Sequence, residues 1–404
     1  MMKDSHSFHL LIISLFLPYP EVTHAGGTNL FHYIEALVKR GHRVSIASYI
    51  FPEEHQKVIS LKPYCEEVSL VPAISTLERR LLKAPYLMTH PLQWVEAYSP
   101  QMHRVISEML TRKRYDMVHF EHLWMTQYVD LVSNCPVILD EVDVDSVVFY
   151  RKFRRDQSFW KRRYYYWCWQ KSVRLEVDAC ERFDLIFTRS EKNRRYLQCL
   201  APGRNIRELP PWFEGLEYDY QPESQVEKNN LLFVGNMSRQ ANIQAVEYFC
   251  QNILPKIIEV IQDVKFYIVG DAPDIQVKRL ASEHVIVTGY VQDLESYYRR
   301  CQVFIAPIQI GGGIIVKVLD ALAAGRPVVC TSIANEGIEA IPDQDLLVAD
   351  SADLFAERTI ELLKNASLWQ RIASGGRAFI ECKYHWETIA DRLERAYLEL
   401  VPEK

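Results

Sequence analysis

Two kinds of segment alternate along the chain: short runs of apolar residues, and longer segments in which apolar residues recur every three or four positions. The runs are typical of strands buried in a parallel sheet, and the longer segments are typical of the helices that cover such a sheet. Predicted strands lie at 8–16, 42–49, 67–71, 117–120, 137–141, 185–189 and 206–209, and then at 231–234, 265–269, 285–288, 303–306, 327–331 and 346–348. Two such series predict an α/β protein with two doubly wound parallel sheets.

The alternation stops between residues 210 and 228, where prolines and acidic residues replace the apolar periodicity. We interpret 210–228 as a linker between an N-terminal domain (1–209) and a C-terminal domain (229–382). Apolar residues at spacings of three and four predict a final helix in 383–404, which can pack back on the N-terminal domain. Doubly wound sheets bind ligands at the carboxyl ends of their strands, so we expect a site in the cleft between the domains.

Charge and cysteine content narrow the class of protein. The 47 basic and 52 acidic residues give a net charge of −5, which does not indicate a nucleic-acid partner. Nine scattered cysteines without a C-x-x-C pair argue against a metal site or a disulfide framework, and they indicate a reducing, cytoplasmic compartment. The apolar start of the chain fits a buried strand better than a signal peptide, and no run reaches the ~20 apolar residues of a membrane-spanning helix.

Glycine is scarce in this chain and unevenly placed. It accounts for 15 of 404 residues, and ten of these lie between Gly235 and Gly376. Glycine permits tight turns and close approach of the backbone to a ligand. The concentration therefore predicts a binding site in the second half of the chain.

Three consecutive glycines, Gly311, Gly312 and Gly313, separate a predicted strand from a predicted helix. A helix start of this kind binds anions, since unpaired N–H groups and the positive end of the helix dipole meet there. Lys317 lies one turn into the helix and can place a positive charge beside a phosphate, and Asp320 can hydrogen-bond sugar hydroxyls. The alternatives are a loop without a ligand and a solvated helix face. The sequence has neither a P-loop nor a G-x-G-x-x-G fingerprint, which argues against a P-loop enzyme and a nicotinamide dehydrogenase.

The run from Gly311 to Val329 resembles the donor-site signature of glycosyltransferase family 4, most closely the branch that makes bacterial exopolysaccharides and cell-surface sugars. Members of this family have the GT-B fold, in which two Rossmann-like domains face a central cleft. Further matches occur in the family's order at Gly26-Gly27, Arg40-Gly41-His42, Ser190-Glu191, Gly235-Asn236, Phe266 to Gly270, Gly289-Tyr290-Val291 and Asn335-Glu336-Gly337. The resemblance covers nearly the whole chain.

The resemblance implies a retaining, metal-independent hexosyltransferase that needs no cofactor. Its co-substrate is then a nucleotide diphosphate sugar. Its acceptor is a hydroxyl of a glycan or of a lipid-linked acceptor at the inner face of the cell membrane. The residues that match donor-binding positions of the family are Gly26, Gly27, Gly235, Asn236, Arg239, Gly270, Tyr290, Val291, Gly311, Gly312, Gly313 and Asp320.

The chain departs from the family's pattern at positions that usually carry charge. Two glutamates separated by seven residues are usual in the family, and Gly312 and Asp320 stand in their place. An arginine and a lysine that commonly follow the first C-terminal strand are replaced by Asn236 and Ala241, which leaves Arg239 as a candidate substitute. The alternative function is therefore a catalytically silent GT-B protein that acts as a partner or scaffold of another transferase.

His119, Glu121 and His122 stand at the end of a predicted strand and match an acidic-then-histidine segment of the family. Each can orient or deprotonate the acceptor hydroxyl, so these three residues and Lys317 are the candidate catalytic residues. A packed core histidine is the alternative for both histidines. Acidic residues at the next strand end lack the glycine and the terminal glutamate of a calcium loop, and we interpret them as a polar wall of the cleft: Asp140, Glu141, Asp143 and Asp145.

Residues 149–171 contain eight lysines or arginines, one acidic residue (Asp156) and ten aromatic residues. This composition predicts a helix that lies on an anionic membrane surface, with basic side chains at lipid headgroups and aromatic rings at the interface. A long amphipathic helix whose aromatic residues belong to the core is the alternative. Base stacking on nucleic acid is a third option, which the net charge does not support.

Overall fold

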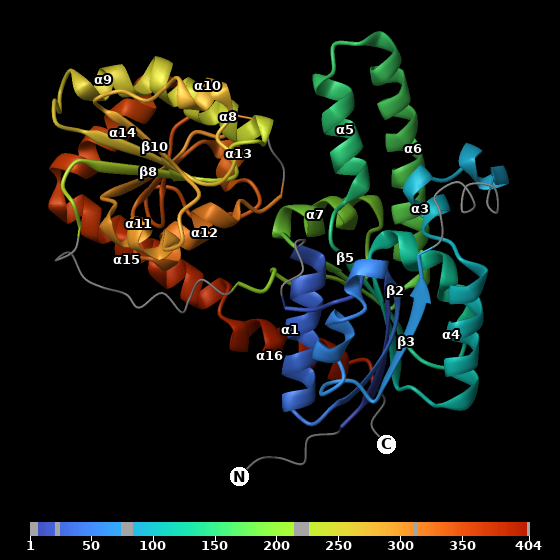
Figure 1. Ribbon diagram of the computed structural model, residues 1–404. Helices are drawn as coiled ribbons and strands as arrows, with labels where there is room; N and C mark the ends of the chain where they lie inside the picture. Colours follow the sequence, from blue (N-terminus) through green and yellow to red (C-terminus); the bar gives the residue numbers. More distant parts are fainter. Residues whose placement is uncertain (1–6, 21–24, 74–83, 214–225, 310–312, 402–404) are drawn as a thin grey trace. The chain divides into compact units, whose positions relative to one another are not determined.

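The computed structural model describes residues 7–20, 25–73, 84–213, 226–309 and 313–401. The chain forms two units, each built on a parallel sheet (Figure 1). One unit comprises Met1–Trp212 and Glu387–Lys404, and the other comprises Phe213–Trp386. The chain therefore passes from the first unit to the second near residue 212 and returns to the first near residue 387.

The first unit contains a seven-stranded parallel sheet in the order β3-β2-β1-β4-β5-β6-β7. Its strands are β1 (His9–Ser14), β2 (Arg43–Ile50), β3 (Glu67–Pro72), β4 (Met117–Glu121), β5 (Val137–Glu141), β6 (Leu185–Thr188) and β7 (Ile206–Glu208). Leu10 and Ile12 of β1 belong to one hydrophobic cluster, and Leu11 and Ile13 belong to another. The sheet is thus buried on both faces, which is why its strands appear in the sequence as continuous apolar runs.

Helices cover both faces of this sheet. The described helices of the first part of the chain are α1 (Ala25–Lys39), α3 (Leu92–Glu96), α4 (Pro100–Arg112), α5 (Asp145–Arg155), α6 (Phe159–Arg182) and α7 (Glu191–Leu200). Short 3-10 helices are η1 (Pro52–Glu54), η2 (Lys57–Ser60), η3 (Ala84–Met88) and η4 (Leu123–Leu131). Gly26 and Gly27 lie in the first turn of α1. Residues of α1 pack on one face of the sheet, and residues of α4 and α6 pack on the other.

The C-terminal helix α16 (Trp386–Leu398) completes the core of the first unit. Leu393 and Tyr397 are buried in the same hydrophobic cluster as residues of β1 and α1. On the polar side of this helix, Glu394 accepts a hydrogen bond from Arg40 at 2.5 Å. Helix α16 is therefore joined to α1 by apolar packing and to Arg40, the residue that follows α1, by an ion pair.

Shortening a buried side chain of α16 tests this packing. We expect Leu393→Ala to lower the free energy of unfolding by about 2–5 kcal/mol, because truncating a fully buried leucine removes apolar contact and leaves a cavity. Leu354→Ala is the matched control, since Leu354 is 38% exposed and its truncation should cost only about 0.5 kcal/mol. Urea titrations followed by circular dichroism measure both values. Equal losses of unfolding free energy in the two variants would show that α16 does not contribute to the core.

The second unit contains a six-stranded parallel sheet in the order β10-β9-β8-β11-β12-β13. Its strands are β8 (Asn230–Val234), β9 (Lys265–Val269), β10 (Val285–Gly289), β11 (Val303–Ala306), β12 (Val328–Cys330) and β13 (Leu347–Val348). Its helices are α8 (Gln240–Tyr248), the π-helical turn η7 (Phe249–Ile253), α9 (Leu254–Ile258), α10 (Ile275–Lys278), α11 (Leu294–Arg300), α12 (Val316–Ala323), α13 (Ser332–Asn335), α14 (Ala352–Lys364) and α15 (Ala366–Lys383). The two doubly wound parallel sheets predicted from the sequence are thus confirmed.

The length and polarity of the helices decide whether any of them could cross a membrane. Within the part of the chain that the structure describes, no helix combines the length and the apolarity that crossing a bilayer requires. The longest, α6, spans 24 residues and carries many charged side chains.

Candidate functional site

Each sheet has one point at which the strand order reverses, between β1 and β4 in the first unit and between β8 and β11 in the second. Doubly wound sheets open a crevice for ligands at this point, beside the carboxyl ends of the strands. Glu121 ends β4, and Gly235 directly follows β8. Candidate residues of both units therefore lie at the edges where such sheets bind ligands.

Glycines bring the strand ends of the second sheet into backbone contact. Gly270 follows β9 with a φ of 144°, and a Cβ at this position would lie 2.0 Å from the carbonyl oxygen of Gly235. The N–H of Gly270 donates a hydrogen bond to the carbonyl oxygen of Gly289 (3.1 Å). A Cβ at Gly235 would lie 2.5 Å from Nζ of Lys317. Glycine at 270 permits the close contact of the strands, and glycine at 235 leaves space for the lysine.

Lys317 of α12 extends to this edge of the second sheet. Its Nζ donates a hydrogen bond to Oδ1 of Asn242 (2.7 Å) and lies 4.2 Å from the centroid of the Phe233 ring. Burial disfavours the ammonium, and the nearby charge of Arg239 adds to this effect, so the pKa of Lys317 is lowered to about 7. The lysine therefore titrates near neutral pH, and it does not lie on a solvated helix face.

The start of α12 lacks a capping side chain. Ile315 occupies the N-cap position and makes no side-chain hydrogen bond to the helix. Gly313, with a φ of 78°, precedes it, and a Cβ at Gly337 would lie 2.4 Å from the carbonyl oxygen of Gly313. Gly311 and Gly312 lie outside the described residues. An uncapped helix start beside a cationic side chain is an arrangement that suits an anion.

Asp320 lies one turn beyond Lys317 and is partly buried. Burial raises the pKa of Asp320 to about 7, and a hydrogen bond from Tyr298 acts in the opposite direction. Tyr298 belongs to α11, and its hydroxyl oxygen lies 3.5 Å from the carbonyl oxygen of Lys317. Asp320 and Tyr298 thus join α12 to α11.

The loop after β8 contributes side chains of three kinds. Oδ1 of Asn236 accepts hydrogen bonds from the N–H (2.9 Å) and the hydroxyl (2.6 Å) of Ser238. Arg239 is exposed at the start of α8. Asn242 is buried, and it contacts both Lys317 and the carbonyl oxygen of Asn236, the latter through Nδ2 at 2.8 Å. Asn242 was not among the site residues predicted from the sequence, although its place in the first turn of α8, the helix that follows β8, could have indicated it.

Tyr290 and Val291 follow β10 at the carboxyl edge of the second sheet. The side chain of Tyr290 is 73% exposed, whereas Val291 packs against the hydrophobic core. Gly289 turns the chain here with a φ of 74°. The tyrosine ring is therefore available to a ligand.

At the edge of the first sheet, Glu121 lies opposite Ser14, the last residue of β1. The Ser14 hydroxyl donates a hydrogen bond to Oε2 of Glu121 (3.0 Å), and Glu121 is 1% exposed. Burial above all, together with the nearby charge of Asp140, raises the pKa of Glu121 to about 7. A carboxyl group with this pKa can donate or accept a proton near neutral pH.

The two candidate histidines differ in their surroundings. His119 is buried, and its Nδ1 lies 2.7 Å from the hydroxyl oxygen of Tyr397. Burial lowers the pKa of His119 to about 4, so the ring is neutral at neutral pH. His122 follows β4 with a φ of 83°, and its ring centroid lies 4.1 Å from that of Trp124. His119 is thus a packed core histidine, whereas His122 stands at the edge of the sheet.

A buried ion pair lies below the carboxyl edge of the first sheet. Nη2 of Arg189 donates a hydrogen bond to Oδ2 of Asp140 (2.7 Å), and its Nη1 donates to the hydroxyl of Tyr33 (2.8 Å). Nε2 of His119 lies 3.9 Å from the same oxygen of Asp140. Of the four acidic residues predicted to form a polar wall of the cleft, Asp140 and Glu141 are fully buried, whereas Asp143 is exposed. Arg189 was not predicted, since no short motif contains both members of the pair.

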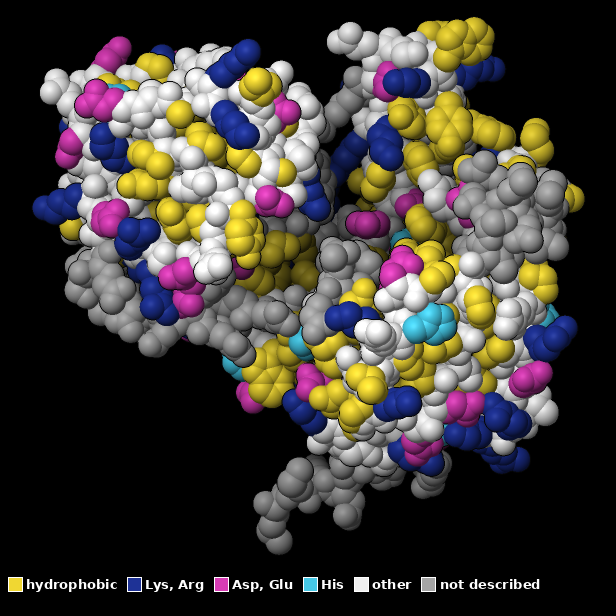
Figure 2. Space-filling model, viewed as in Figure 1, with side chains coloured by type: hydrophobic (Ala, Val, Ile, Leu, Met, Phe, Trp, Pro, Cys, Tyr) yellow, Lys and Arg dark blue, Asp and Glu magenta, His cyan; other side chains and the backbone are white. Residues whose placement is uncertain are grey.

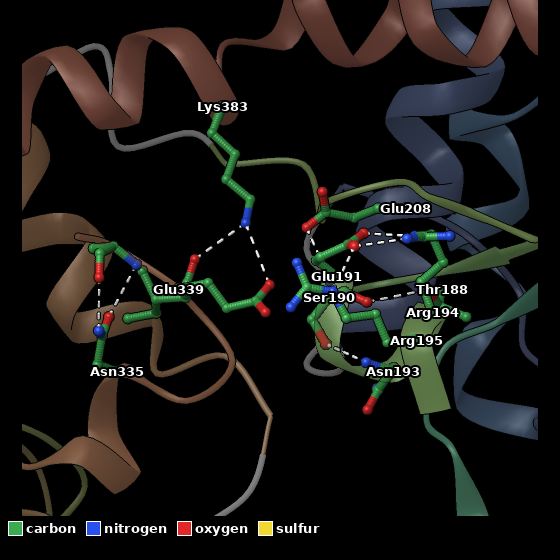
Figure 3. A network of polar contacts seen from close by, with 12 residues as sticks. Thr188, Ser190, Glu191, Asn193, Arg194, Arg195, Glu208, Asn335, Glu339 and Lys383 are labelled. Atoms are coloured by element: carbon green, nitrogen blue, oxygen red, sulfur yellow. Dashed lines mark hydrogen bonds and ion pairs between the residues drawn. The ribbon is translucent and has the colours of Figure 1, made fainter. Parts of the chain in front are cut away.

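Figure 3 shows further polar contacts within each unit. In the first unit, Glu191 at the start of α7 accepts hydrogen bonds from Arg194 (2.6 Å) and Arg195 (2.9 Å). These bonds, chiefly those from Arg194, lower the pKa of Glu191 to about 2. In the second unit, Nζ of Lys383 lies 3.8 Å from Oε2 of Glu339. Glu191 remains ionised and paired within its own helix, which argues against a role in proton transfer.

Comparison with protein families bears on the second unit. Residues 228–365 match the family described as glycosyl transferases group 1. The matched residues extend from just before β8 to the end of α14, and they include Gly235, Gly270, Lys317 and Asp320. The edge described above therefore lies within the part of the chain that is similar to glycosyl transferases group 1.

Two relatives are similar to this chain, one over most of its length and one over about half of it. An uncharacterized 44.6 kDa protein in the cps region of Klebsiella pneumoniae is 26% identical over 394 residues, which are 93% of this chain and 96% of the relative. A GDP-mannose-dependent alpha-(1-6)-phosphatidylinositol monomannoside mannosyltransferase of Mycobacterium tuberculosis is 24% identical over 229 residues, 51% of this chain and 59% of the relative.

Comparison with solved structures bears on the fold of nearly the whole chain. The crystal structure of Anabaena Alr3699/HepE in complex with UDP matches 97% of this chain and 100% of its own, with a TM-score of 0.65 and 12% sequence identity. The two parallel-sheet, Rossmann-like domains of this chain and its match to solved structures such as that of TarM (TM-score 0.66, 10% sequence identity, 96% of this chain) confirm the predicted GT-B fold.

Proposed function

We propose that this protein is a retaining glycosyltransferase that moves a hexose from a nucleotide diphosphate sugar to a hydroxyl of a glycan or lipid-linked acceptor in surface polysaccharide synthesis. The observation that carries the proposal is the partly buried ammonium of Lys317, which lies beside Gly235 on the helix with the uncapped start. The names of the relatives support the choice, since one is encoded in a cps region, one depends on GDP-mannose and one binds UDP.

The donor chemistry follows from charge. Departure of a nucleotide diphosphate leaves negative charge on phosphate oxygens, and preorganised cations and N–H groups stabilise that charge. Lys317 and the first N–H groups of α12 are groups of this kind. A bound diphosphate raises the pKa of Lys317 from about 7, so the bound protein holds the ammonium form. We propose that these groups, with exposed Arg239, replace a metal ion and that no cofactor takes part.

On the acceptor side, we propose that Glu121 exchanges the proton of the acceptor hydroxyl. Its pKa of about 7 matches this task, and its position at the end of β4 matches the ligand edge of the sheet. His122, the next residue, is proposed to orient the acceptor. His119 is assigned a positioning role, because its ring is buried, neutral and hydrogen-bonded to Tyr397.

A catalytically silent GT-B protein that serves as a partner of another transferase is the second candidate. The observation that favours it is Asn236, whose side chain is hydrogen-bonded to Ser238 where the family commonly has an arginine. Replacing Lys317 and Asp320 together with alanine separates the candidates. An enzyme loses its biological effect in this variant, whereas a scaffold keeps it.

Nucleotide binding is the direct test of the proposed donor site. Thermal-shift titrations with UDP, GDP, ADP and their sugars should show a rise in Tm for one base, because a ligand that binds only the folded state stabilises it. Gly235→Ala should remove this rise, since the new Cβ would lie 2.5 Å from Nζ of Lys317. Gly203→Ala is the matched control: it lies in the first unit with no heavy atom within 4 Å, and it should lower Tm through backbone strain but preserve the nucleotide-induced rise. The proposal fails if the protein neither binds nor hydrolyses any of these sugar nucleotides.

A further inference from the structure

The basic aromatic segment 149–171 forms most of a helical hairpin. α5 and α6 lie side by side and extend away from the sheet of the first unit, and residues 156–158 connect them (Figure 1). The connection and the first turns of α6 are the part of this hairpin farthest from the sheet, and we call them the hairpin tip.

The aromatic residues of the hairpin divide into two sets. Tyr150 and Phe153 of α5 pack against Trp169 and Tyr166 of α6, with ring centroids 5.3 and 5.4 Å apart. These rings join the two helices, but they do not belong to the core of the unit, since Tyr150 and Tyr166 are each 40% exposed.

The second set faces outward from α6. Phe159 is 68% exposed, Trp160 77%, Tyr164 46% and Trp167 39%. Positions 160, 164 and 167 recur at helical spacing, so they form one stripe along the helix. A hollow of about 490 Å³ runs along this stripe, lined by Trp160, Arg163, Tyr164, Tyr166, Trp167 and Gln170. In Figure 2, hydrophobic and basic side chains lie together on the hairpin, at the upper right.

The charge of the segment is opposite to that of the chain. Residues 149–171 carry eight lysines or arginines and a single acidic residue, whereas the whole chain has 47 basic and 52 acidic residues. Lys152, Arg154, Lys161, Arg162 and Arg163 are all exposed. A positive patch on an otherwise acidic protein selects for an anionic surface rather than for a neutral one.

We propose that the hairpin tip docks on the surface of a bilayer that contains anionic phospholipids. Tryptophan, tyrosine and phenylalanine rings place apolar area at the depth of the lipid headgroups. Lysine and arginine side chains beside them contact the negative headgroups while their stems cover apolar surface. Phe159 and Trp160 are exposed and lie side by side at the hairpin tip, so both rings can bury apolar surface in a bilayer. A purely polar ligand would leave the ring of Phe159 exposed to water.

Vesicle flotation with the full-length protein and without any sugar nucleotide tests this docking independently of the proposed function. We expect the protein to float with vesicles of phosphatidylcholine that contain about one third phosphatidylglycerol, and to float at least tenfold less with phosphatidylcholine alone. Raising the salt concentration to about 1 M should release it, because the Debye length then falls to about 3 Å. Equal flotation with both vesicles, or no flotation, overturns the proposal.

Charge and ring variants separate the two contributions. Lys161→Gln with Arg163→Gln should weaken binding to the anionic vesicles about tenfold or more, and Trp160→Ser should weaken it further. Arg162 is kept, because its guanidinium lies 5.3 Å from the centroid of the Phe153 ring and contributes to the packing of the hairpin. The matched controls are Lys278→Gln with Arg279→Gln, an exposed basic pair at α10, and Ile59→Ser, a side chain that is 71% exposed.

The controls and two further measurements decide among other occupants of this surface. Controls that weaken flotation as much as the hairpin variants overturn the proposal. So does a concentration-dependent dimer in light scattering that Trp160→Ser abolishes, since a second copy of the chain then covers the stripe. Binding of a soluble, lipid-free glycan that Trp160→Ser abolishes, without flotation, likewise assigns the hollow to a sugar and overturns the lipid proposal.

Discussion

Replacing Lys317 with methionine should lower the rate of sugar transfer by about 10²–10³-fold. Loss of one preorganised group that faces developing negative charge typically has an effect of this size. Methionine keeps much of the side-chain volume beside Phe233 while it removes the charge and the hydrogen bond to Asn242. Turnover of the sugar nucleotide identified by thermal shift measures the effect. Lys278→Met, at an exposed lysine of α10, is the matched control and should leave the rate unchanged.

The same lysine predicts a pH dependence of nucleotide binding. The pKa of Lys317 in the free protein is about 7, so above pH 7 a diphosphate binds with uptake of a proton and its affinity should fall, by up to about tenfold per pH unit. Calorimetry in two buffers of different ionisation enthalpy measures the uptake.

Asp320 also has a pKa of about 7, and its ionisation would weaken anion binding over the same range. Asp320→Asn should keep the pH dependence, and Lys317→Met should abolish it; the opposite pattern would assign the titration to the carboxyl group.

Loss of activity in Lys317→Met should not reflect unfolding. The pKa of Lys317 is lowered from 10.5 to about 7 on folding, so between these values the unfolded chain binds the additional proton. The contribution of this lysine to stability therefore rises with pH across that window and is unfavourable below it. Methionine removes this unfavourable contribution, and the variant should be at least as stable as the parent at pH 6.

Asp140→Ala should lower the free energy of unfolding by about 3–5 kcal/mol. The substitution leaves the guanidinium of Arg189 in the interior without its counter-ion, and an uncompensated buried charge is expensive. Asp391→Ala is the matched control, because it removes a carboxylate that also pairs with an arginine, Arg40, but is 61% exposed. Pairs of that kind contribute about 1 kcal/mol or less.

A double variant identifies the cause of this loss. Replacing Arg189 with methionine in the Asp140→Ala background removes the unpaired charge, so the double variant should be more stable than Asp140→Ala alone. Urea titrations of the four proteins give the coupling energy. If the losses of unfolding free energy in the two single variants add up to the loss in the double variant, the ion pair is not the source of the destabilisation.

The fold could be predicted because its physical signal is local. Strands buried on both faces of a parallel sheet appear as continuous apolar runs, and the positions of these runs matched both sheets. The glycines were informative for a similar reason, since a contact such as that between Gly270 and Gly235 excludes every larger residue.

The partners of the site residues could not be predicted, because they depend on distant parts of the chain. Lys317 bonds Asn242 across 75 positions, and Arg189 bonds Asp140 across 49. The burial of Asp140 could not be predicted for the same reason. Its polarity indicated an exposed position, whereas its pairing with Arg189 permits a position in the core. The hairpin shows a third case, since periodicity alone did not separate rings that pack between helices from rings that face outward.

The return of α16 to the first unit has a consequence for how the protein is made. Leu393 and Tyr397 are synthesised more than 370 residues after β1, yet they complete the core that contains this strand. The second unit has all of its residues available while the first still lacks part of its interior. The first unit therefore cannot reach its final packing until α16 has been synthesised, and a chain that stops before Leu393 would leave this core unfinished.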